Sequence, residues 1–520
     1  MKFGYNDTVK KLTKRIWVSL ILFGLFGQLA WAVENMYFNL FIYNTVAKST
    51  RAVTVMVQAS GIVGTVTALI MGTVSDRIGN RKAMLSLGYI FWGISTLAFA
   101  FINTENIQNI FNIDPAASSG LFGLSGNGAT LTVAVTLIAI IVMDCVMTFF
   151  GSTANDAAYN TWVTDNVDGK NRSKVESVLS TFPLVALLIV AGGFGLLLGE
   201  NNNYPRMFYI LGGTVTACGV AGLFFVKDRK GLSPEKLEKL WKNLAYGFLP
   251  STVKRYKPFY IVLLAWLLIS IAAQIFMPYL VIYLEQYLKF TVIEYSIILG
   301  SMVLSAAIVI VILGRVTEKI GRFRMLLIGC AAYTVGLFSI YFVHDVGKTA
   351  LMVTLAGTGF VMLIGMLLVT TTLGAYLRDF TPVDSAGKLQ GARMVAQVLI
   401  PMFTGPAIGD AINQAMARKN PDLTYIDITT EMTANIPAPE IFLVGSLVLL
   451  TILLPIFLLR REQKKHGLVM QWQPSGCAEP TLGIGRELQK SDGADCADNS
   501  QTDGTQTPLN DTEATAEKKV

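Results

Sequence analysis

Twelve apolar runs follow one another along this chain, and each is near or above the roughly 20 residues that a helix needs to cross a bilayer. None has the alternation of about ten residues that marks a membrane β-barrel strand. Apolar residues make up 52% of the 520 positions and charged residues only 15%, a balance unlike that of a soluble enzyme. The runs cover residues 17–43, 53–74, 84–102, 130–163, 178–198, 207–226, 258–288, 292–316, 325–343, 350–376, 388–412 and 441–459. The sequence therefore predicts an all-α membrane protein with twelve transmembrane helices.

The twelve runs fall into two sets of six, separated by a polar stretch. We predict an N-terminal six-helix bundle over 1–226, a cytoplasmic central loop over 227–257, a C-terminal six-helix bundle over 258–459 and a largely disordered cytoplasmic tail over 460–520. Ala30, Trp31 and Ala32 resemble a signal-cleavage site, but the apolar run continues past them. We therefore expect the first run to remain as an uncleaved helix.

The basic residues are distributed very unevenly over the predicted loops. With the amino terminus inside, 35 of the 42 Lys and Arg lie in inner segments. The seven outer ones are Lys48, Arg51, Arg206, Lys289, Lys348, Arg418 and Lys419. Because cytoplasmic loops carry the excess of basic residues, both termini are expected in the cytoplasm of a multi-pass cell-membrane protein. The net charge of +7 then needs no nucleic-acid partner.

Residues 72–82 and 314–324 match each other at a constant offset of 242 positions, with glycine, acid, base, isoleucine, glycine and base in register. The chain is thus an internal duplication, and the two bundles should be pseudo-symmetric. Arginines in such a loop can bridge carboxylates across the two halves in one conformation and release them in another. The predicted gating residues are Asp76, Arg77, Arg81, Glu318, Lys319 and Arg322. The alternative is that these charges only mark the cytoplasmic face.

The 72–82 loop is similar to the signature loop of the major facilitator superfamily, and 314–324 lies where that superfamily repeats it. The resemblance implies the fold of that superfamily, in which two halves rock about a central solute site. It also implies that the first and fourth helices face the seventh and tenth across the cavity.

Three carboxylates, Glu34, Asp144 and Asp156, lie inside apolar runs. Charged groups within a bilayer are costly and usually mark a pathway or a site. Carboxylates and amides can hold hydroxyl pairs while an aromatic ring stacks on the face of a sugar. The predicted substrate-binding residues are Trp31, Glu34, Asn35, Asp144, Asn155, Asp156, Tyr159, Gln274, Tyr279 and Thr371. The alternative is that such groups only form hydrogen bonds between helices.

Other charged residues near the ends of the runs have simpler interpretations. Glu285 and Asp410 lie toward the outer ends of their helices, where we expect water to reach them. Arg393 has two open interpretations: an inner-side contact with Asp379 or Asp384, or a plain interfacial arginine.

The stretch from Asp156 to Val163 resembles the fourth-helix region of the glycoside, pentoside and hexuronide cation symporters. In that family the matching aspartate binds sugar, which implies the same role for Asp156. The family's first-helix sugar-binding aspartate aligns with Leu29 here, and its second-helix cation-binding aspartates align with Gly64 and Ala68. Residues 24–44 look more like relatives near that family and like sucrose-proton carriers.

Because the family's cation-binding aspartates are replaced at Gly64 and Ala68, a proton carried by Glu34, Asp144 or Asp156 is a simpler coupling ion here than sodium. The predicted function is proton-coupled import of a sugar or glycoside by alternating access, carried out by a monomer. Two alternatives stay open: an exporter of amphipathic compounds, and a non-transporting membrane sensor of solutes. We expect no enzyme activity, no cofactor and no metal, because the five cysteines and two histidines lack metal-ligand spacing.

Overall fold

The computed structural model describes residues 12–113, 128–167, 169–199, 202–228, 245–343, 347–382, 386–427 and 432–465. Within these ranges, twelve helical spans are long and apolar enough to cross a membrane. They follow the twelve apolar runs, so the predicted all-α membrane architecture is confirmed. The predicted tail from residue 466 onward lies outside the described residues.

The first six spans form the N-terminal half, and several of them change helix type midway. The first, fourth and fifth spans each contain a π-helical segment. The elements are α1 Lys14–Val33, η1 Glu34–Phe38, α2 Asn39–Thr45, α3 Thr50–Ile78, α4 Arg81–Ala98, η2 Phe99–Phe101, α5 Thr104–Phe111, α6 Gly128–Gly151, η4 Ser152–Tyr159, α7 Asn160–Asn166, α8 Gly169–Leu179, α9 Phe182–Ile189, η5 Val190–Phe194, α10 Gly195–Leu198 and α11 Tyr204–Phe225.

The C-terminal half begins with a short helix inside the segment predicted as a central loop, and it ends in a helix that continues past Leu459. Between its last two spans lies a β-hairpin. The elements are α13 Pro250–Arg255, α14 Lys257–Phe276, η7 Met277–Tyr279, α15 Leu280–Ile282, η8 Tyr283–Tyr287, α16 Val292–Ile320, α17 Arg322–Tyr341, α18 Lys348–Asp379, α19 Ala386–Met394, η10 Val395–Leu399, α20 Ile400–Lys419, η11 Pro421–Leu423, β1 Thr424–Asp427, β2 Met432–Asn435, α21 Glu440–Leu450 and α22 Leu453–Lys465.

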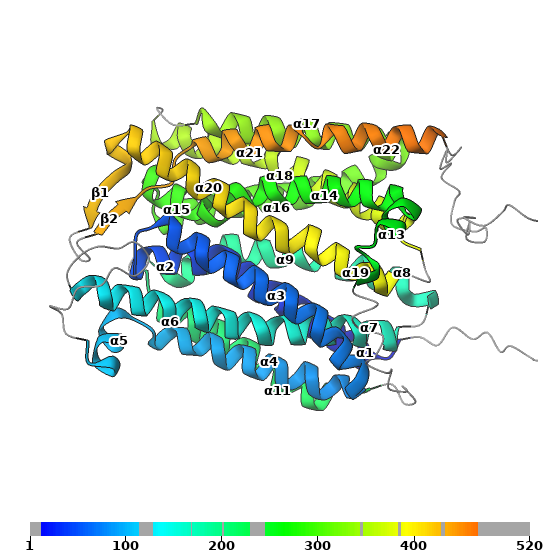
Figure 1. Cartoon of the computed structure of the whole chain (residues 1–520), viewed down its shortest axis with the longest axis horizontal. Helices are drawn as coiled ribbons and strands as arrows, with labels where there is room; N and C mark the ends of the chain where they lie inside the picture. The colour runs from blue at the N-terminus through cyan, green and yellow to red at the C-terminus, as the bar shows by residue number, and fades with distance from the viewer. Residues whose placement is uncertain are drawn as a thin grey trace, which may run out of the picture. The chain divides into compact units, whose positions relative to one another are not determined.

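The long helices of residues 12–465 run side by side between two ends (Figure 1). At one end α1 begins and α22 finishes, and we name it the terminal end. The opposite end carries the antiparallel pair β1 and β2, in which Thr424 faces Asn435, and we name it the hairpin end. These two ends give the directions used below for the space between the halves.

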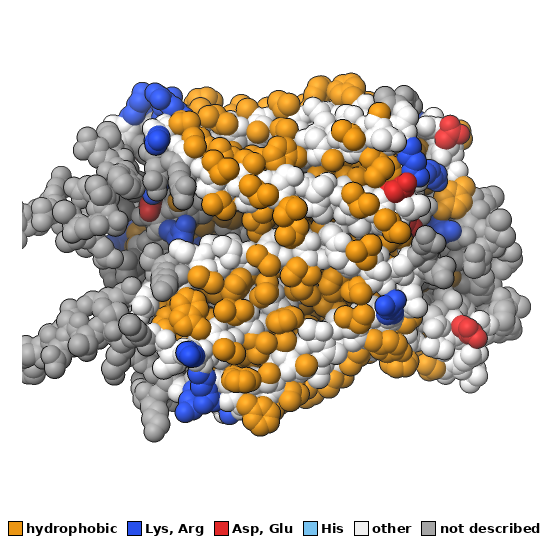
Figure 2. Space-filling view, turned by 180° about the vertical axis from the view of Figure 1, so that it is seen from behind, with side chains coloured by type: hydrophobic (Ala, Val, Ile, Leu, Met, Phe, Trp, Pro, Cys, Tyr) orange, Lys and Arg blue, Asp and Glu red, His pale blue; other side chains and the backbone are white. Residues whose placement is uncertain are grey.

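On the face seen in Figure 2, apolar side chains cover the middle, while Lys, Arg, Asp and Glu gather toward the two ends. Large apolar side chains in the spans are strongly exposed, among them Phe224 at 71% and Val311 and Val353 at 68%. Exposure of this kind would be unfavourable in water and is normal for helices that face lipid.

The internal duplication has a structural counterpart at two glycines. Helix α3 ends before Gly79, which has φ 66°, and α16 ends before Gly321, which has φ 92°. Backbone at positive φ favours glycine because a Cβ atom there is strained. The repeated glycine therefore ends the second span of each half at positive φ, although ψ differs, at 1° for Gly79 and 141° for Gly321.

Candidate functional site

The buried carboxylate of Glu34 joins three helices of the N-terminal half. It begins η1, and its Oε1 atom accepts hydrogen bonds from Ser60 Oγ of α3 at 3.1 Å and from Thr148 Oγ1 of α6 at 3.4 Å. The two hydroxyls are 2.8 Å apart. Glu34 is 8% exposed. The first span thus brings its carboxylate into the contact between the second and fourth spans.

Asp144 lies one turn before Thr148 on α6 and is 1% exposed. Its carboxyl group also interacts with the Ser60 hydroxyl, and it is close enough to Glu34 to act on it electrostatically. We call Glu34, Ser60, Asp144 and Thr148 the carboxylate cluster. Oε2 of Glu34 and Oδ1 of Asp144 are buried and have no hydrogen-bond partner among the residues that the structure describes. A buried acceptor without a donor is costly, so the cluster is incomplete without a proton or a cation.

Asp156 lies at the edge of this region. It is half-buried within the π-helical segment η4, and its Oδ1 accepts a hydrogen bond from Asn155 Nδ2 at 3.3 Å. It too is close enough to Glu34 to act on it electrostatically. Short π-helical segments in membrane helices frequently occur at functional sites. Here both Glu34 and Asp156 lie on such segments.

Two other predicted binding residues of the fourth span are used in helix packing. Asn155 Oδ1 accepts a hydrogen bond from the hydroxyl of Tyr89 at 3.1 Å. The hydroxyl of Tyr159 donates to the backbone oxygen of Leu20 at 2.8 Å. Both side chains are buried. These contacts match the alternative stated for such groups, in which they hold neighbouring helices together.

Trp31 and Asn35 lie on one face of the first span. Trp31 is half-buried and its ring is 5.0 Å from that of Trp92. Asn35 is exposed, and its Nδ2 donates to the backbone oxygen of Trp31 at 2.7 Å. Polar groups within membrane helices almost always face the bundle interior or a water-filled cavity.

In the C-terminal half the predicted residues have separate partners. Tyr279 is fully buried, and its hydroxyl lies 2.5 Å from Thr54 Oγ1 of the other half and donates to the backbone oxygen of Pro406 at 2.9 Å. Gln274 is half-buried and packs tightly against Gly405. Thr371 is exposed and donates to the backbone oxygen of Leu367 at 2.7 Å. Tyr279 therefore links the halves, whereas the contacts of Gln274 with Gly405 and of Thr371 with Leu367 lie within one half.

Two carboxylates expected to be solvated are instead held between the halves at the hairpin end. Asp410, only 8% exposed, accepts a hydrogen bond from Thr50 Oγ1 at 2.6 Å. Glu285 is half-buried and accepts a hydrogen bond from Asn44 Nδ2 at 2.8 Å. The prediction of solvation was wrong because Thr50 and Asn44 of the other half cover the two carboxylates. Each carboxylate also accepts a hydrogen bond from a glutamine of its own half, Gln414 for Asp410 and Gln286 for Glu285.

Sequence reasoning missed the β-hairpin, which also joins the halves. The backbone N–H of Asn435 donates to the backbone oxygen of Lys48 at 3.0 Å, and the hydroxyl of Tyr43 donates to the backbone oxygen of Asn435 at 2.9 Å. Lys48 Nζ lies 5.4 Å from the centre of the Tyr425 ring. The only β-prone signal was the short run of Thr424, Tyr425 and Ile426, because the partner strand 432–435 contains alanine and asparagine, which are depleted in strands.

At the terminal end, two arginines of the repeated loops pair within their own halves. Arg81 Nε lies 3.1 Å from Asp165 Oδ2, and Arg322 Nη1 lies 2.5 Å from Asp379 Oδ2. Each arginine is the first residue of the third span of its half, and each aspartate lies near the end of the fourth. These pairs do not bridge the halves as predicted, because each arginine reaches the neighbouring helix of its own bundle.

The other predicted gating residues lie beside these pairs. Arg77 and Lys319 are exposed, and the side chains of Asp76 and Glu318 lie outside the described part of the structure.

A different ion pair joins the halves at the terminal end. Arg378 Nη1 lies 3.9 Å from Glu176 Oε2, and the two side chains are 67% and 44% exposed. Arg393 does not bind Asp379 as one interpretation had it, because Arg322 occupies that carboxylate. The second candidate partner, Asp384, lies outside the described residues.

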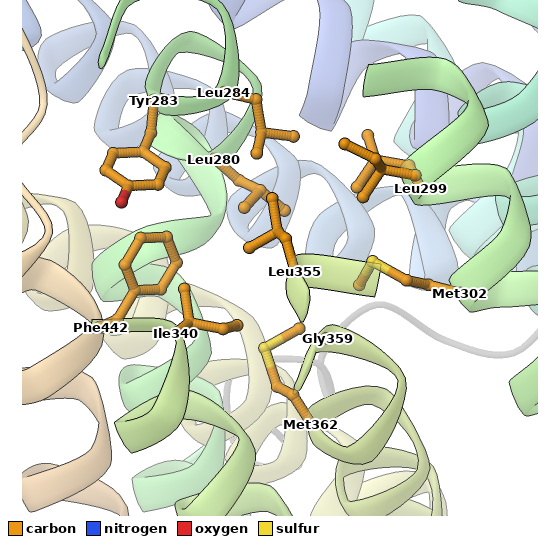
Figure 3. Close-up of a pocket in the computed structure, with 11 residues that line it drawn as sticks. Leu280, Tyr283, Leu284, Leu299, Met302, Ile340, Leu355, Gly359, Met362 and Phe442 are labelled. Carbon is orange, nitrogen blue, oxygen red and sulfur yellow. The ribbon is translucent and has the colours of Figure 1, made fainter. Parts of the chain in front are cut away.

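A pocket inside the C-terminal half is lined almost entirely by apolar side chains, which offer few hydrogen-bonding groups to a polar solute (Figure 3). Its lining includes Leu280, Leu299, Met302 and Phe442, and its one labelled polar atom is the hydroxyl oxygen of Tyr283. The pocket lies among helices of one half and away from the carboxylate cluster. We treat it as a packing gap beside the irregular seventh span.

The family model of the Major Facilitator Superfamily matches residues 16–406. A search of curated proteins finds no match. Among solved structures, a D-xylose-proton symporter is similar with a TM-score of 0.61 and 13% identity, over 86% of this chain and 97% of that chain. The nucleoside transporter NupG gives a TM-score of 0.59 and 11% identity, over 86% and 100%. A bacterial metal transporter gives 0.55 and 13%, over 87% and 100%.

At these identities the structural likeness is one of fold alone. The family model, however, spans well over half of the sequence. The chain therefore belongs to the Major Facilitator Superfamily, and it is a multi-pass membrane transporter of small molecules and not an enzyme.

Proposed function

We propose that this transporter imports a sugar or glycoside together with a proton, by alternating access and with both termini in the cytoplasm. The observation that carries the proposal is the carboxylate cluster. Two carboxyl groups buried side by side, each with an oxygen that lacks a donor, are unfavourable when both are ionised. A proton on either group removes one charge and adds an O–H donor, so the cluster has a physical reason to take up a proton.

The location of the cluster suits energy coupling. Glu34 bonds to helices of the second and fourth spans, so its charge state affects how the first span packs within its half. A proton that enters from one side and leaves on the other carries one charge across the membrane, which is worth about 2.3 kcal/mol per 100 mV. That free energy is enough to bias the rocking of the two halves.

The solute side of the proposal rests on polar and aromatic residues of both halves. Asp156, Asn35 and Trp31 offer a carboxylate, an amide and an indole ring, and Gln274 and Thr371 offer an amide and a hydroxyl from the other half. Such groups suit ring hydroxyls. The structures similar in fold include proteins named for D-xylose and for nucleosides, two solutes that carry ring hydroxyls.

Uptake in proteoliposomes that contain the pH-sensitive dye pyranine tests the proposal. Addition of xylose, glucose, sucrose or a methyl glycoside should acidify the lumen if one of them is a substrate. The double variant Glu34→Gln with Asp144→Asn should lose acidification while it still exchanges labelled solute across the bilayer. Glu105→Gln, a change of an exposed carboxylate on α5, is the matched control and should behave as the wild type.

Three outcomes would reject parts of this assignment. Solute uptake without acidification, or acidification that persists in the double variant, rejects proton coupling through the cluster. Thermal stabilisation by lipophilic cations and not by sugars would favour an exporter of amphipathic compounds. Stabilisation by a sugar without any flux would favour a sensor.

A further inference from the structure

The two halves differ in the connection between their third and fourth spans. In the C-terminal half this connection covers only residues 342–347, between α17 and α18. In the N-terminal half the third span ends at Phe101, and helix α5, Thr104–Phe111, follows it before α6 begins at Gly128. Helix α5 lies at the hairpin end and contacts α6 (Figure 1). The internal duplication therefore does not explain α5.

Hydrogen bonds fix both ends of α5. At its start, Oδ1 of Asn103 accepts a hydrogen bond from the backbone N–H of Asn106 at 2.7 Å, and Nδ2 of Asn106 donates to the backbone oxygen of Phe101 at 2.8 Å. At its end, Asn112 has the left-handed conformation with φ 47°, and its N–H donates to the backbone oxygen of Gln108. These caps hold α5 at one angle to the end of the third span.

One face of α5 is apolar. Ile107, Ile110 and Phe111 are three and four positions apart and so share a face, while Glu105 and Asn109 lie on the opposite face. Ile107 is buried, but Ile110 is 69% exposed and Phe111 61%. A helix this short is not stable alone in water, and two large apolar side chains exposed side by side usually mark an interaction surface. The apolar face therefore needs a partner beyond α6.

The exposed apolar face continues the lipid-facing surface of the spans. Phe101, the last residue of the third span, is 61% exposed, and its ring centre lies 6.1 Å from that of Tyr209 in the sixth span, which is 47% exposed. Exposed aromatic residues at the ends of spans are typical of the membrane–water interface. Because α5 begins three positions after Phe101, it begins at the edge of the bilayer.

The charges of this region indicate which kind of lipid surface fits. Residues 99–113 contain no lysine or arginine and a single acid, Glu105. Interfacial helices that select anionic lipids carry basic residues on their polar face, which add electrostatic attraction to apolar insertion. Helix α5 offers apolar insertion alone. It therefore fits the boundary between headgroups and acyl chains whatever the charge of the headgroup.

We propose that α5 is an interfacial helix whose Ile110 and Phe111 side chains insert into the leaflet at the hairpin end, while Glu105 and Asn109 face water. The N-terminal half is thereby held to this leaflet. The connection at 342–347 is too short for a helix of the same length in the C-terminal half. At the hairpin end, the movement between the halves should then fall mainly on the C-terminal half.

Depth-dependent fluorescence quenching tests the proposal with the full-length chain in nanodiscs of phosphatidylcholine. The dye NBD is attached at Phe111→Cys or at Asn109→Cys, in a background without native cysteines. Nitroxides on the lipid headgroup or along the acyl chain report the depth of the dye. The dye at Phe111→Cys should lie about 5–10 Å inside the headgroup boundary and be shielded from iodide in the water. The dye at Asn109→Cys, the matched control on the opposite face, should be quenched by iodide.

Two double variants make the test independent of the dye. Ile110→Asn with Phe111→Asn removes the apolar face, and amide hydrogen exchange over residues 107–111 should become roughly tenfold faster, because the helix then opens more often. Ile110→Leu with Phe111→Leu keeps the face apolar, so exchange should stay as in the wild type. The unfolding temperature of each double variant shows whether the rest of the chain is folded.

Three outcomes would overturn the proposal. Equal iodide quenching at the two positions would mean that the apolar face of α5 lies in water. Shielding of Phe111→Cys from iodide and nitroxides alike, with a disulfide between two molecules, would assign the face to a second copy of the chain. Insertion only in nanodiscs with phosphatidylglycerol, and its loss in about 1 M salt, would mean that headgroup charge is required. None of these outcomes depends on the transported solute, so the proposed function is tested separately.

Discussion

At the hairpin end the two halves meet through hydrogen bonds of buried groups, whereas Arg378 and Glu176, which join them at the terminal end, are largely exposed. The hairpin-end hydrogen bonds between side chains are 2.5 to 2.8 Å long, and the terminal-end ion pair measures 3.9 Å. A hydrogen bond to a charged group contributes about 1.5–3 kcal/mol, while an exposed ion pair contributes about 0–1 kcal/mol. The interface is thus held more firmly at the hairpin end.

The chemistry at the hairpin end suits a contact that must open in each transport cycle. Asp410 and Glu285 accept their hydrogen bonds from a hydroxyl and an amide of the other half. When the halves separate, water can hydrate both carboxylates, which offsets the lost bonds. A buried salt bridge would leave two charges to be desolvated again on closing. Neutral donors therefore keep the closed and open states close in free energy.

The largest effect on this comparison is expected from Thr50→Val. Valine has nearly the shape of threonine but cannot donate to Oδ1 of Asp410. The Gln414 amide still donates to Oδ2, and a buried oxygen left without its donor costs about 1–3 kcal/mol. The ratio of open to closed molecules at the hairpin end should rise roughly five- to a hundredfold. Spin labels at Glu105→Cys and Lys419→Cys, in a background without native cysteines, report the distance between the halves by pulsed electron resonance.

Thr45→Val is the matched control for this change. Its hydroxyl donates to the backbone oxygen of Phe41 in its own helix, and the residue is exposed. The distance distribution should stay as in the wild type. If Thr50→Val and Thr45→Val give the same distribution, the hydrogen bond to Asp410 does not hold this end closed.

A smaller opening should follow from Tyr279→Phe, which deletes a hydroxyl shared between Thr54 of one half and Pro406 of the other. Loss of a neutral hydrogen bond costs about 1 kcal/mol, so the ratio of open to closed molecules should rise roughly fivefold. The same pair of spin labels measures this ratio. Tyr333→Phe is the control, because its buried hydroxyl has no hydrogen-bond partner in the described part of the chain. An equal shift in both variants would mean that the change of ring and not the lost bond is responsible.

How much of this structure the sequence could predict depends on how many positions apart along the chain the interacting residues lie. The twelve spans follow from length and polarity alone, because a bilayer imposes one length on every helix. The duplicated glycines Gly79 and Gly321 also follow, since each needs only its local backbone. The interactions of Asp410 and Glu285 do not, because their donors lie 360 and 241 positions away.

The candidate site was predicted in part for the same reason. Glu34 and Asp144 stood out as carboxylates within apolar runs, and they lie together as members of one cluster. Their shared partner Ser60 was not noticed, because a serine in a membrane helix carries no signal of its own. Helical spacing placed Asn155 on the same face as Asp144, but it could not show that Tyr89 covers it. Helical spacing predicts which residues share one face of a helix, but it does not predict which other helix packs against that face.

The hairpin should make a modest contribution to closure, which Tyr43→Phe measures. This change removes one hydrogen bond to the backbone of Asn435 and leaves the bond between Asn435 and Lys48 in place. We expect the free energy that holds the hairpin against the N-terminal half to fall by about 0.5–1 kcal/mol. Amide hydrogen exchange in residues 432–435 should become a few times faster. Tyr209→Phe, at an exposed position, should leave these amides unchanged, and unaltered exchange in Tyr43→Phe would show that the hairpin closes without this bond.

The smallest effect is expected at the terminal end, from Glu176→Gln. Its pair with Arg378 is long and exposed, so its loss should change the free energy between open and closed states by about 0–1 kcal/mol. Labels at Thr164→Cys and Arg461→Cys, both exposed at this end, report the distance between the halves. Raising the salt concentration to about 1 M should mimic the variant, since exposed charges are then screened beyond about 3 Å. A shift at this end larger than the shift that Thr50→Val causes at the other would reverse the comparison, because the exposed ion pair would then be the stronger of the two closures.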